Sequence, residues 1–143
     1  MASTAEINHY KNIPNVLTAF REGHNQILSI GLDVKLHHLL KLRASQMNSC
    51  AYCVNMHSEE ARSDGETQQR LDRLIVWRHV EDFSEAERAA LAWTEALTDL
   101  DETNDLASLR EGLKKHFSDT DISGITAAIA MINLWNRIGV SNH

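Results

Sequence analysis

Two cysteines and one histidine lie close together in this sequence. Cys50 and Cys53 are the only cysteines of the chain, and His57 follows Cys53 by four residues. In a helix, where each residue turns by about 100°, these three positions share one narrow face. The thiolate is the reactive form of cysteine, and a nearby histidine or helix N-terminus lowers the thiol pKa. The pattern therefore predicts a redox-active dithiol with an imidazole one helical turn away.

The residues before the first cysteine predict where that helix begins. Asn48 and Ser49 are residue types that cap helix N-termini. The cysteines should then lie in the first helical turn, where the helix dipole favours a thiolate. On this argument alone Cys50, which is nearer the helix end, is as good a nucleophile as Cys53.

A second pattern lies upstream of the cysteines. His38, Leu42 and Ser45 recur at i, i+4 and i+7, beside a separate leucine stripe, so the helix that carries them should pack on two sides. Of the adjacent pair His37 and His38, only one can face inward with Leu42 and Ser45, and the spacing selects His38. We therefore expect His38 and Ser45 to face the dithiol.

Helical periodicity accounts for most of the chain, and no useful stretch alternates with period two. The sequence predicts an all-α, oligomeric fold of six to seven helices, forming one domain over residues 1–143 with an irregular N-terminal arm at residues 1–13. Low proline and glycine content agrees with this. The expected helices cover residues 15–30, 34–47, 50–63, 67–79, 84–100, 104–117 and 120–139.

The last of these helices is apolar nearly all round over residues 125–134. Such a helix is expected to be buried, either centrally or between subunits. Asn133, Asn136 and Arg137 interrupt it, and because buried polar groups need partners they should form a hydrogen-bond network or an interface contact.

Composition excludes several functions. The formal net charge is −6 and no basic run is present, which argues against a nucleic-acid partner. No signal-peptide pattern opens the chain, and no apolar stretch is long enough to span a membrane, so we expect a cytoplasmic protein with no membrane partner. Thiols are normally reduced in that compartment, where a CxxC pair is more often catalytic or metal-binding than structural.

A metal site is the main alternative use of these residues. Cys50, Cys53 and His57 supply three ligands, and His37 or His38 would have to supply the fourth that a structural zinc site needs. The spacings of zinc fingers and ribbons are absent. We therefore expect neither a metal ion nor another cofactor.

At this point the chain resembles a known family. Residues 42–57, LRASQMNSCAYCVNMH, are similar to the signature of the alkylhydroperoxidase D-like (AhpD-like) proteins of the carboxymuconolactone decarboxylase superfamily. The resemblance continues at residues 83–93 and 133–137, and covers most of the chain from about Leu17 onward. It implies an all-α fold that assembles as homo-oligomeric trimers or hexamers, and reduction of hydroperoxides by the dithiol. The decarboxylase branch of the superfamily generally lacks this dithiol.

The resemblance also implies a role for each residue. Cys53 attacks the peroxide, Cys50 resolves the product to a disulfide, and His57 carries the proton. The family usually has a glutamate twelve residues before the first cysteine, and His38 occupies that position here. We assign His38 to the relay behind His57, and Ser45 as a hydrogen-bond donor.

The resulting hypothesis is a thiol-dependent peroxidase-like enzyme whose partners are a hydroperoxide and a dithiol reductant. Two rival interpretations remain open. One is a dithiol oxidoreductase or redox sensor that acts on the disulfides of other proteins. The other is a non-catalytic oligomer that binds a small molecule or a metal.

Overall fold

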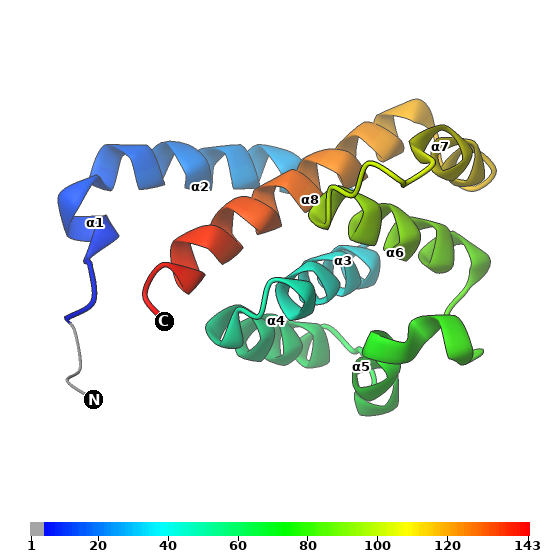
Figure 1. The fold of residues 1–143 in the computed structure, drawn as a ribbon, viewed down its shortest axis with the longest axis horizontal. Coiled ribbons are helices and arrows are strands. Elements are labelled where there is room, and N and C mark those ends of the chain that lie inside the picture. The colour runs from blue at the N-terminus through cyan, green and yellow to red at the C-terminus, as the bar shows by residue number, and fades with distance from the viewer. Residues whose placement is uncertain (1–4) are drawn as a thin grey trace.

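Helices form the whole architecture of the computed structural model, which describes residues 5–143. That part of the chain contains eight α-helices, one 3-10 helix and no strand (Figure 1). The elements are α1 (His9–Asn12), α2 (Pro14–Leu28), α3 (Val34–Met47), α4 (Ala51–Ser63), α5 (Gln68–Arg73), η1 (Leu74–His79), α6 (Glu85–Thr98), α7 (Leu106–Lys114) and α8 (Asp119–Val140).

The all-α prediction is confirmed, but the count of six to seven helices is wrong. Part of the expected irregular arm forms α1, because the Asn8 side chain accepts a hydrogen bond from the Lys11 N–H and caps this short helix. The first four residues of that arm lie outside the described residues.

The single helix expected over residues 67–79 is also divided, into α5 and η1. The backbone leaves helical geometry at Val76, with φ −117° and ψ 26°. Carbonyl groups around this kink need other partners. Arg88 of α6 supplies them, because its guanidinium donates to the carbonyl oxygens of Trp77, Arg78 and Val80.

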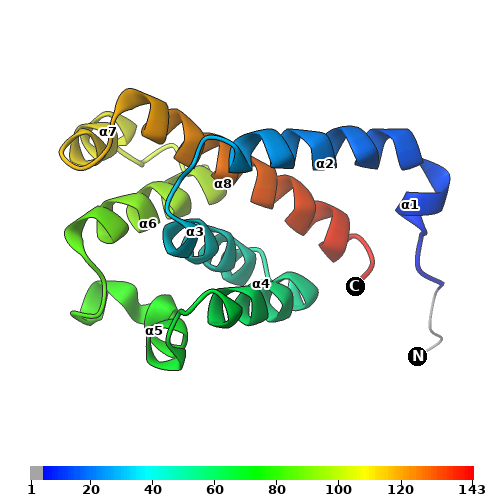
Figure 2. The same ribbon diagram turned by 180° about the vertical axis from the view of Figure 1, so that it is seen from behind.

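Helix α3 lies at the centre of the molecule and packs against α4, α6 and α8 (Figures 1 and 2). Its packing through two faces is confirmed, but the expected leucine stripe is divided between them. One contributes Leu39 and Leu42 to a cluster with residues of α4, α5, η1 and α6. The other contributes Leu36 and Leu40 to a cluster with residues of α6, α7 and α8. Side chains on α3 are therefore fixed from several sides.

Helix α8 runs across the outer face of α3 and α6 and also contacts α2 (Figure 1). One of its faces, which includes Ile125, Ile129 and Ile132, is buried within the chain, whereas Ala130 is exposed. No helix of residues 5–143 is long and apolar enough to cross a membrane.

The segment before α1 is tied to the end of the chain. The Ile7 N–H donates to Asn142 Oδ1 at 2.9 Å, and Asn142 Nδ2 donates to the Ile7 carbonyl oxygen at 3.0 Å. A third hydrogen bond joins His9 Nε2 and Ser141 Oγ at 2.8 Å. These contacts hold the N-terminal segment beside the last turn of α8, close to the dithiol.

Candidate functional site

The two cysteines stand at the start of α4, and the local backbone explains this position. Ser49 has a left-handed conformation, with φ 55°, and reverses the chain after α3. The Cys50 N–H then donates to the Ser45 carbonyl oxygen at 3.1 Å. Cys50 itself is the N-cap, and its Sγ accepts a hydrogen bond from the Cys53 N–H at 3.3 Å. The cysteines thus lie in the first helical turn, as the sequence predicts.

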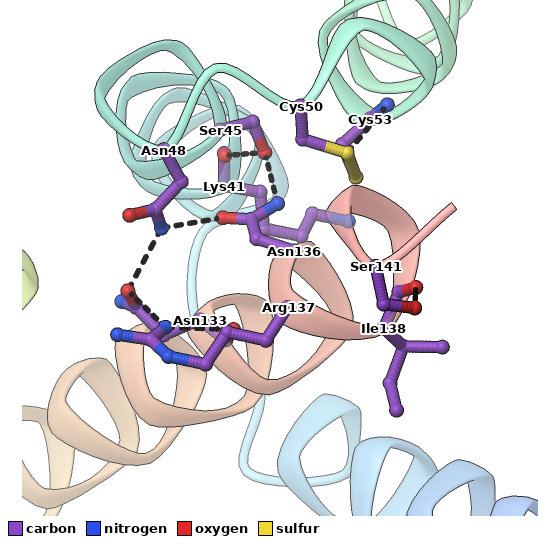
Figure 3. Close-up of a disulfide and its surroundings, with 10 residues drawn as sticks. All are labelled: Lys41, Ser45, Asn48, Cys50, Cys53, Asn133, Asn136, Arg137, Ile138 and Ser141. Atoms are coloured by element: carbon purple, nitrogen blue, oxygen red, sulfur yellow. Dashed lines mark hydrogen bonds between the residues drawn. A yellow bond between two sulfur atoms is a disulfide. The ribbon is translucent and has the colours of Figure 1, made fainter. Parts of the chain in front are cut away.

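Cys50 and Cys53 are joined by a disulfide, with their Cα atoms 5.2 Å apart. The disulfide is buried, since Cys50 is 0% and Cys53 4% exposed. The end of α8 covers it (Figure 3). A Cβ atom on Gly139 would lie 3.0 Å from Cys50 Sγ and 3.5 Å from Cys53 Sγ. A residue without a side chain at position 139 is therefore what lets α8 approach the sulfur atoms this closely.

A polar network fixes the turn before the cysteines (Figure 3). Asn48 Nδ2 donates to the side-chain oxygens of Asn133 at 2.9 Å and Asn136 at 3.0 Å. Asn136 Nδ2 donates to Ser45 Oγ at 2.9 Å, and Arg137 donates to Asn133. The network expected for the polar residues of the last helix is confirmed, and it lies within one chain.

His57 lies one turn after Cys53 and is 6% exposed. Its Nδ1 is 3.1 Å from Glu60 Oε2. An ionised carboxylate only accepts hydrogen bonds, so Nδ1 carries the hydrogen and Nε2 is free to accept a proton. Burial and then the charge of Lys41 lower the pKa of His57, and Glu60 only partly offsets them. His57 is thus a neutral base at pH 7.

The structure gives His38 and Ser45 other partners. Both are buried, at 6% and 0% exposure. His38 Nε2 is 2.6 Å from Asp64 Oδ2, while its Nδ1 has no hydrogen-bond partner among residues 5–143. Ser45 Oγ donates to the Lys41 carbonyl oxygen at 2.7 Å and accepts from Asn136. Their catalytic roles remain predictions.

Sequence reasoning did not single out Lys41 and Glu60. Lys41 is only 7% exposed, because α3 carries it into the centre of the fold. Its Nζ is 3.5 Å from Glu60 Oε2, the same oxygen that pairs with His57. The sequence contains two signals of these residues. Lys41 interrupts the apolar run of residues 39–42, and Glu60 follows His57 by three residues.

A cavity of about 720 Å³ opens beside Cys53. Lys41, His57 and Glu60 line this cavity together with Cys53. The remaining wall comes from α2, α4, the end of α8 and the N-terminal segment that Asn142 holds in place, and includes the large side chains of Ile7, Tyr10, Met56, Trp135 and Ile138. The site therefore combines a dithiol, a neutral base and room for an organic molecule.

The site does not assemble metal ligands. Within the described part of the chain, no group of three or more His, Cys, Asp or Glu side chains is placed to hold a metal ion. The imidazole of His37, a candidate fourth ligand, lies near that of His24, with ring centroids 6.2 Å apart.

Comparisons with known proteins agree with this geometry. The model of the Carboxymuconolactone decarboxylase family matches residues 14–96. A solved structure of ATU0492 from Agrobacterium tumefaciens, a protein of unknown function considered an AhpD antioxidant defence protein, is similar with a TM-score of 0.91 and 42% identity, over 97% of this chain and 95% of that one. An alkylhydroperoxidase AhpD core protein from Ralstonia eutropha JMP134, described as peroxidase-related, is similar with a TM-score of 0.77 and 26% identity, over 90% and 69% of the two chains. The uncharacterized protein YdfG of Bacillus subtilis (strain 168) is 29% identical over 94% of this chain and 92% of its own length.

Proposed function

Because the chain belongs to the carboxymuconolactone decarboxylase family and has an AhpD-like fold, we propose that it is a thiol peroxidase that reduces organic hydroperoxides through Cys50 and Cys53. The observation that carries the proposal is the placement of Cys53 and His57 on one wall of an organic-sized cavity. A neutral imidazole beside a thiol is the arrangement that generates a thiolate nucleophile.

The proposed cycle has three balanced steps. The thiolate of Cys53 attacks the terminal peroxide oxygen, the O–O bond breaks, and the alcohol leaves with the proton that His57 took from the thiol. Cys53 is then a sulfenic acid, and the Cys50 thiol condenses with it to give the disulfide and water. An external dithiol reduces the disulfide and is itself oxidised to a disulfide. We assign His38, which pairs with Asp64, to the proton relay behind His57. We assign Ser45, which accepts a hydrogen bond from Asn136, to a supporting position next to Cys50.

Burial of the disulfide favours a small substrate over another protein's disulfide. Cys53 is 4% exposed, so the disulfide of a folded partner protein has little access to its sulfur atom. A small hydroperoxide can enter the adjacent cavity. We place this chemistry in the cytoplasm, where reducing conditions regenerate the dithiol.

The decisive experiment measures reduction of cumene hydroperoxide by the pre-reduced protein with a dithiol reductant present. Cys53→Ser is expected to abolish reduction. Cys50→Ser, pre-reduced and then freed of the reductant, is expected to reduce one equivalent of peroxide and to retain one added oxygen atom at Cys53 by mass spectrometry. His57→Ala should slow turnover by about a hundredfold, whereas His79→Ala, at an exposed site, should leave it unchanged.

The same variants separate the competing outcomes. If Cys53→Ser instead gave the single turnover and Cys50→Ser gave none, the roles of the two cysteines would be exchanged. A fully reduced wild-type protein that consumes no hydroperoxide would exclude the peroxidase function.

We also propose that the protein is a homo-oligomer, a trimer or a hexamer. Several apolar side chains on and around α2 are exposed in the single chain: Ile13, Val16, Leu28, Ile30 and Val34. An interface between subunits would remove these side chains from water. Light scattering is expected to give a multiple of the 16.1 kDa chain mass, and Val16→Glu should lower it. A wild-type protein that stays at the chain mass at micromolar concentration would contradict this.

A further inference from the structure

Helices α3 and α4 are joined by two polar pairs in antiparallel register. His38 of α3 pairs with Asp64 at the C-terminal end of α4. One turn further along α3, Lys41 pairs with Glu60, one turn back along α4. The second pair is thus one turn nearer the cysteines at the start of α4, and its two side chains line the cavity together with Cys53 and His57, whereas His38 and Asp64 do not.

Glu60 is the link between the imidazole and the ammonium group. Its Oε2 atom is 3.1 Å from His57 Nδ1 and 3.5 Å from Lys41 Nζ. Burial alone would raise the pKa of Glu60, but the hydrogen bond from His57 and the charge of Lys41 lower it below its usual value. Glu60 is therefore ionised, and its carboxylate contacts both the imidazole of His57 and the ammonium group of Lys41.

We propose that Lys41 and Glu60 are the positioning residues of the dithiol site: Glu60 orients His57, and Lys41 supplies the positive charge that stabilises the Cys53 thiolate. This inference rests on the proposed function and names the groups that tune it. A carboxylate on Nδ1 holds the imidazole in the tautomer whose Nε2 accepts the thiol proton. A cation close to a thiolate lowers the thiol pKa.

The chemical step then has a defined proton path. His57 Nε2 takes the proton of the Cys53 thiol, and the imidazolium is paired with Glu60. The thiolate attacks the peroxide, the O–O bond breaks, and the proton on Nε2 passes to the alkoxide that leaves as an alcohol. Lys41 donates no proton in this step, because its role is to favour negative charge on sulfur.

Other titratable groups around the cavity must be considered for any pH profile. Helix α8 contributes none, since Trp135, Ile138 and Gly139 line this side. His38 of α3 lowers the pKa of His57 slightly, after burial and Lys41 have acted. The remaining charged or titratable side chains on the wall are Glu6, His9, Tyr10, Arg21, His24 and Tyr52.

The test measures the pKa of a single thiol. In a Cys50→Ser background, the rate of iodoacetamide alkylation of Cys53 is followed against pH. Lys41→Met is expected to raise the thiol pKa by about one unit, and so to slow alkylation near neutral pH about tenfold, while Lys41→Arg should retain the thiol pKa of the Cys50→Ser parent. Glu60→Gln is expected to leave the thiol pKa unchanged or lower it, because a negative charge is removed.

Turnover is measured separately, with both cysteines present. Lys41→Met and Glu60→Gln should both slow peroxide reduction at least tenfold, although they move the thiol pKa differently. The matched controls are Lys35→Met on α3 and Glu59→Gln on α4, both at exposed positions, which should change neither quantity. If Lys41 and Glu60 only stabilised the fold, their replacements would not change the thiol pKa in these different ways.

The inference is overturned if the thiol pKa in Lys41→Met equals that of the Cys50→Ser parent, or if His38→Ala moves the thiol pKa more than Lys41→Met does. Lys41→Arg and Glu60→Gln keep the test valid if the methionine variant does not fold, as judged by circular dichroism. If no variant and no wild-type protein reduces peroxide, the proposed function fails, but the alkylation profile still decides the roles of Lys41 and Glu60.

Discussion

Acidification from about pH 7 to about pH 4.5 is expected to lower the free energy of unfolding by about 2.5 kcal/mol through His37 alone. His37 is 6% exposed on α3. Burial, followed by the charges of Lys41, His24, His38 and His57, lowers its pKa from 6.5 to about 4. Each pKa unit corresponds to about 1.4 kcal/mol, which gives this order of magnitude.

The direction follows from where the proton binds. In the unfolded chain His37 takes up a proton near pH 6.5, whereas in the folded chain it stays neutral until about pH 4. The unfolded state therefore binds more protons between these values, so stability is complete above about pH 6.5 and is lost as the pH falls. Glu60, Glu87 and Glu95, whose pKa values are lowered by their ion-pair partners despite burial, change stability in the same direction.

Urea unfolding at a series of pH values isolates the histidine. His37→Leu introduces an apolar side chain of similar size and is expected to remove the part of the loss of stability between about pH 6.5 and about pH 4 that His37 causes. His79→Leu, at an exposed position, should leave the wild-type pH dependence intact. Parallel pH profiles for wild type and His37→Leu would show that His37 is not held neutral by the fold.

The sequence predicted those parts of the site that depend on spacing along one helix. The shared face of Cys50, Cys53 and His57 follows from helical periodicity. Capping preferences indicated a helix start close to Asn48 and Ser49, but the N-cap is Cys50 itself, and Asn48 is the C-cap of α3. Periodicity also indicated that α3 packs on two sides, and the need of buried polar groups for partners indicated a network on the last helix, which the structure shows.

Pairings between helices could not be derived from the sequence. Periodicity placed His38 on an inward face, but its partner Asp64 depends on the antiparallel register of α3 and α4. The same register brings Lys41 to Glu60, so neither residue could be assigned to the site from the sequence. The division of α5 and η1 likewise depends on Arg88, which belongs to the next helix, α6, and donates to the carbonyl groups at the kink.

Replacement of Asn136 by alanine is expected to destabilise the fold by about 3 kcal/mol, because it removes two buried hydrogen bonds and leaves a cavity. Asn136 is 0% exposed. Its side chain donates to Ser45 Oγ at 2.9 Å and accepts from Asn48 Nδ2 at 3.0 Å. It thereby fastens α8 to the turn that places Cys50 at the start of α4.

Chemical denaturation of Asn136→Ala, compared with Asn55→Ala at an exposed position of α4, measures this effect. A double-mutant cycle with Ser45→Ala should give a coupling energy of about 1 kcal/mol for the Asn136–Ser45 hydrogen bond. A loss below about 1 kcal/mol for Asn136→Ala would show that the network adds little to the stability of the fold.

Because Cys50 is buried under α8, the loosened turn in Asn136→Ala should also expose it. The reduced variant should therefore alkylate at Cys50 faster than the reduced wild type, which would connect the network to protection of the Cys50 thiol.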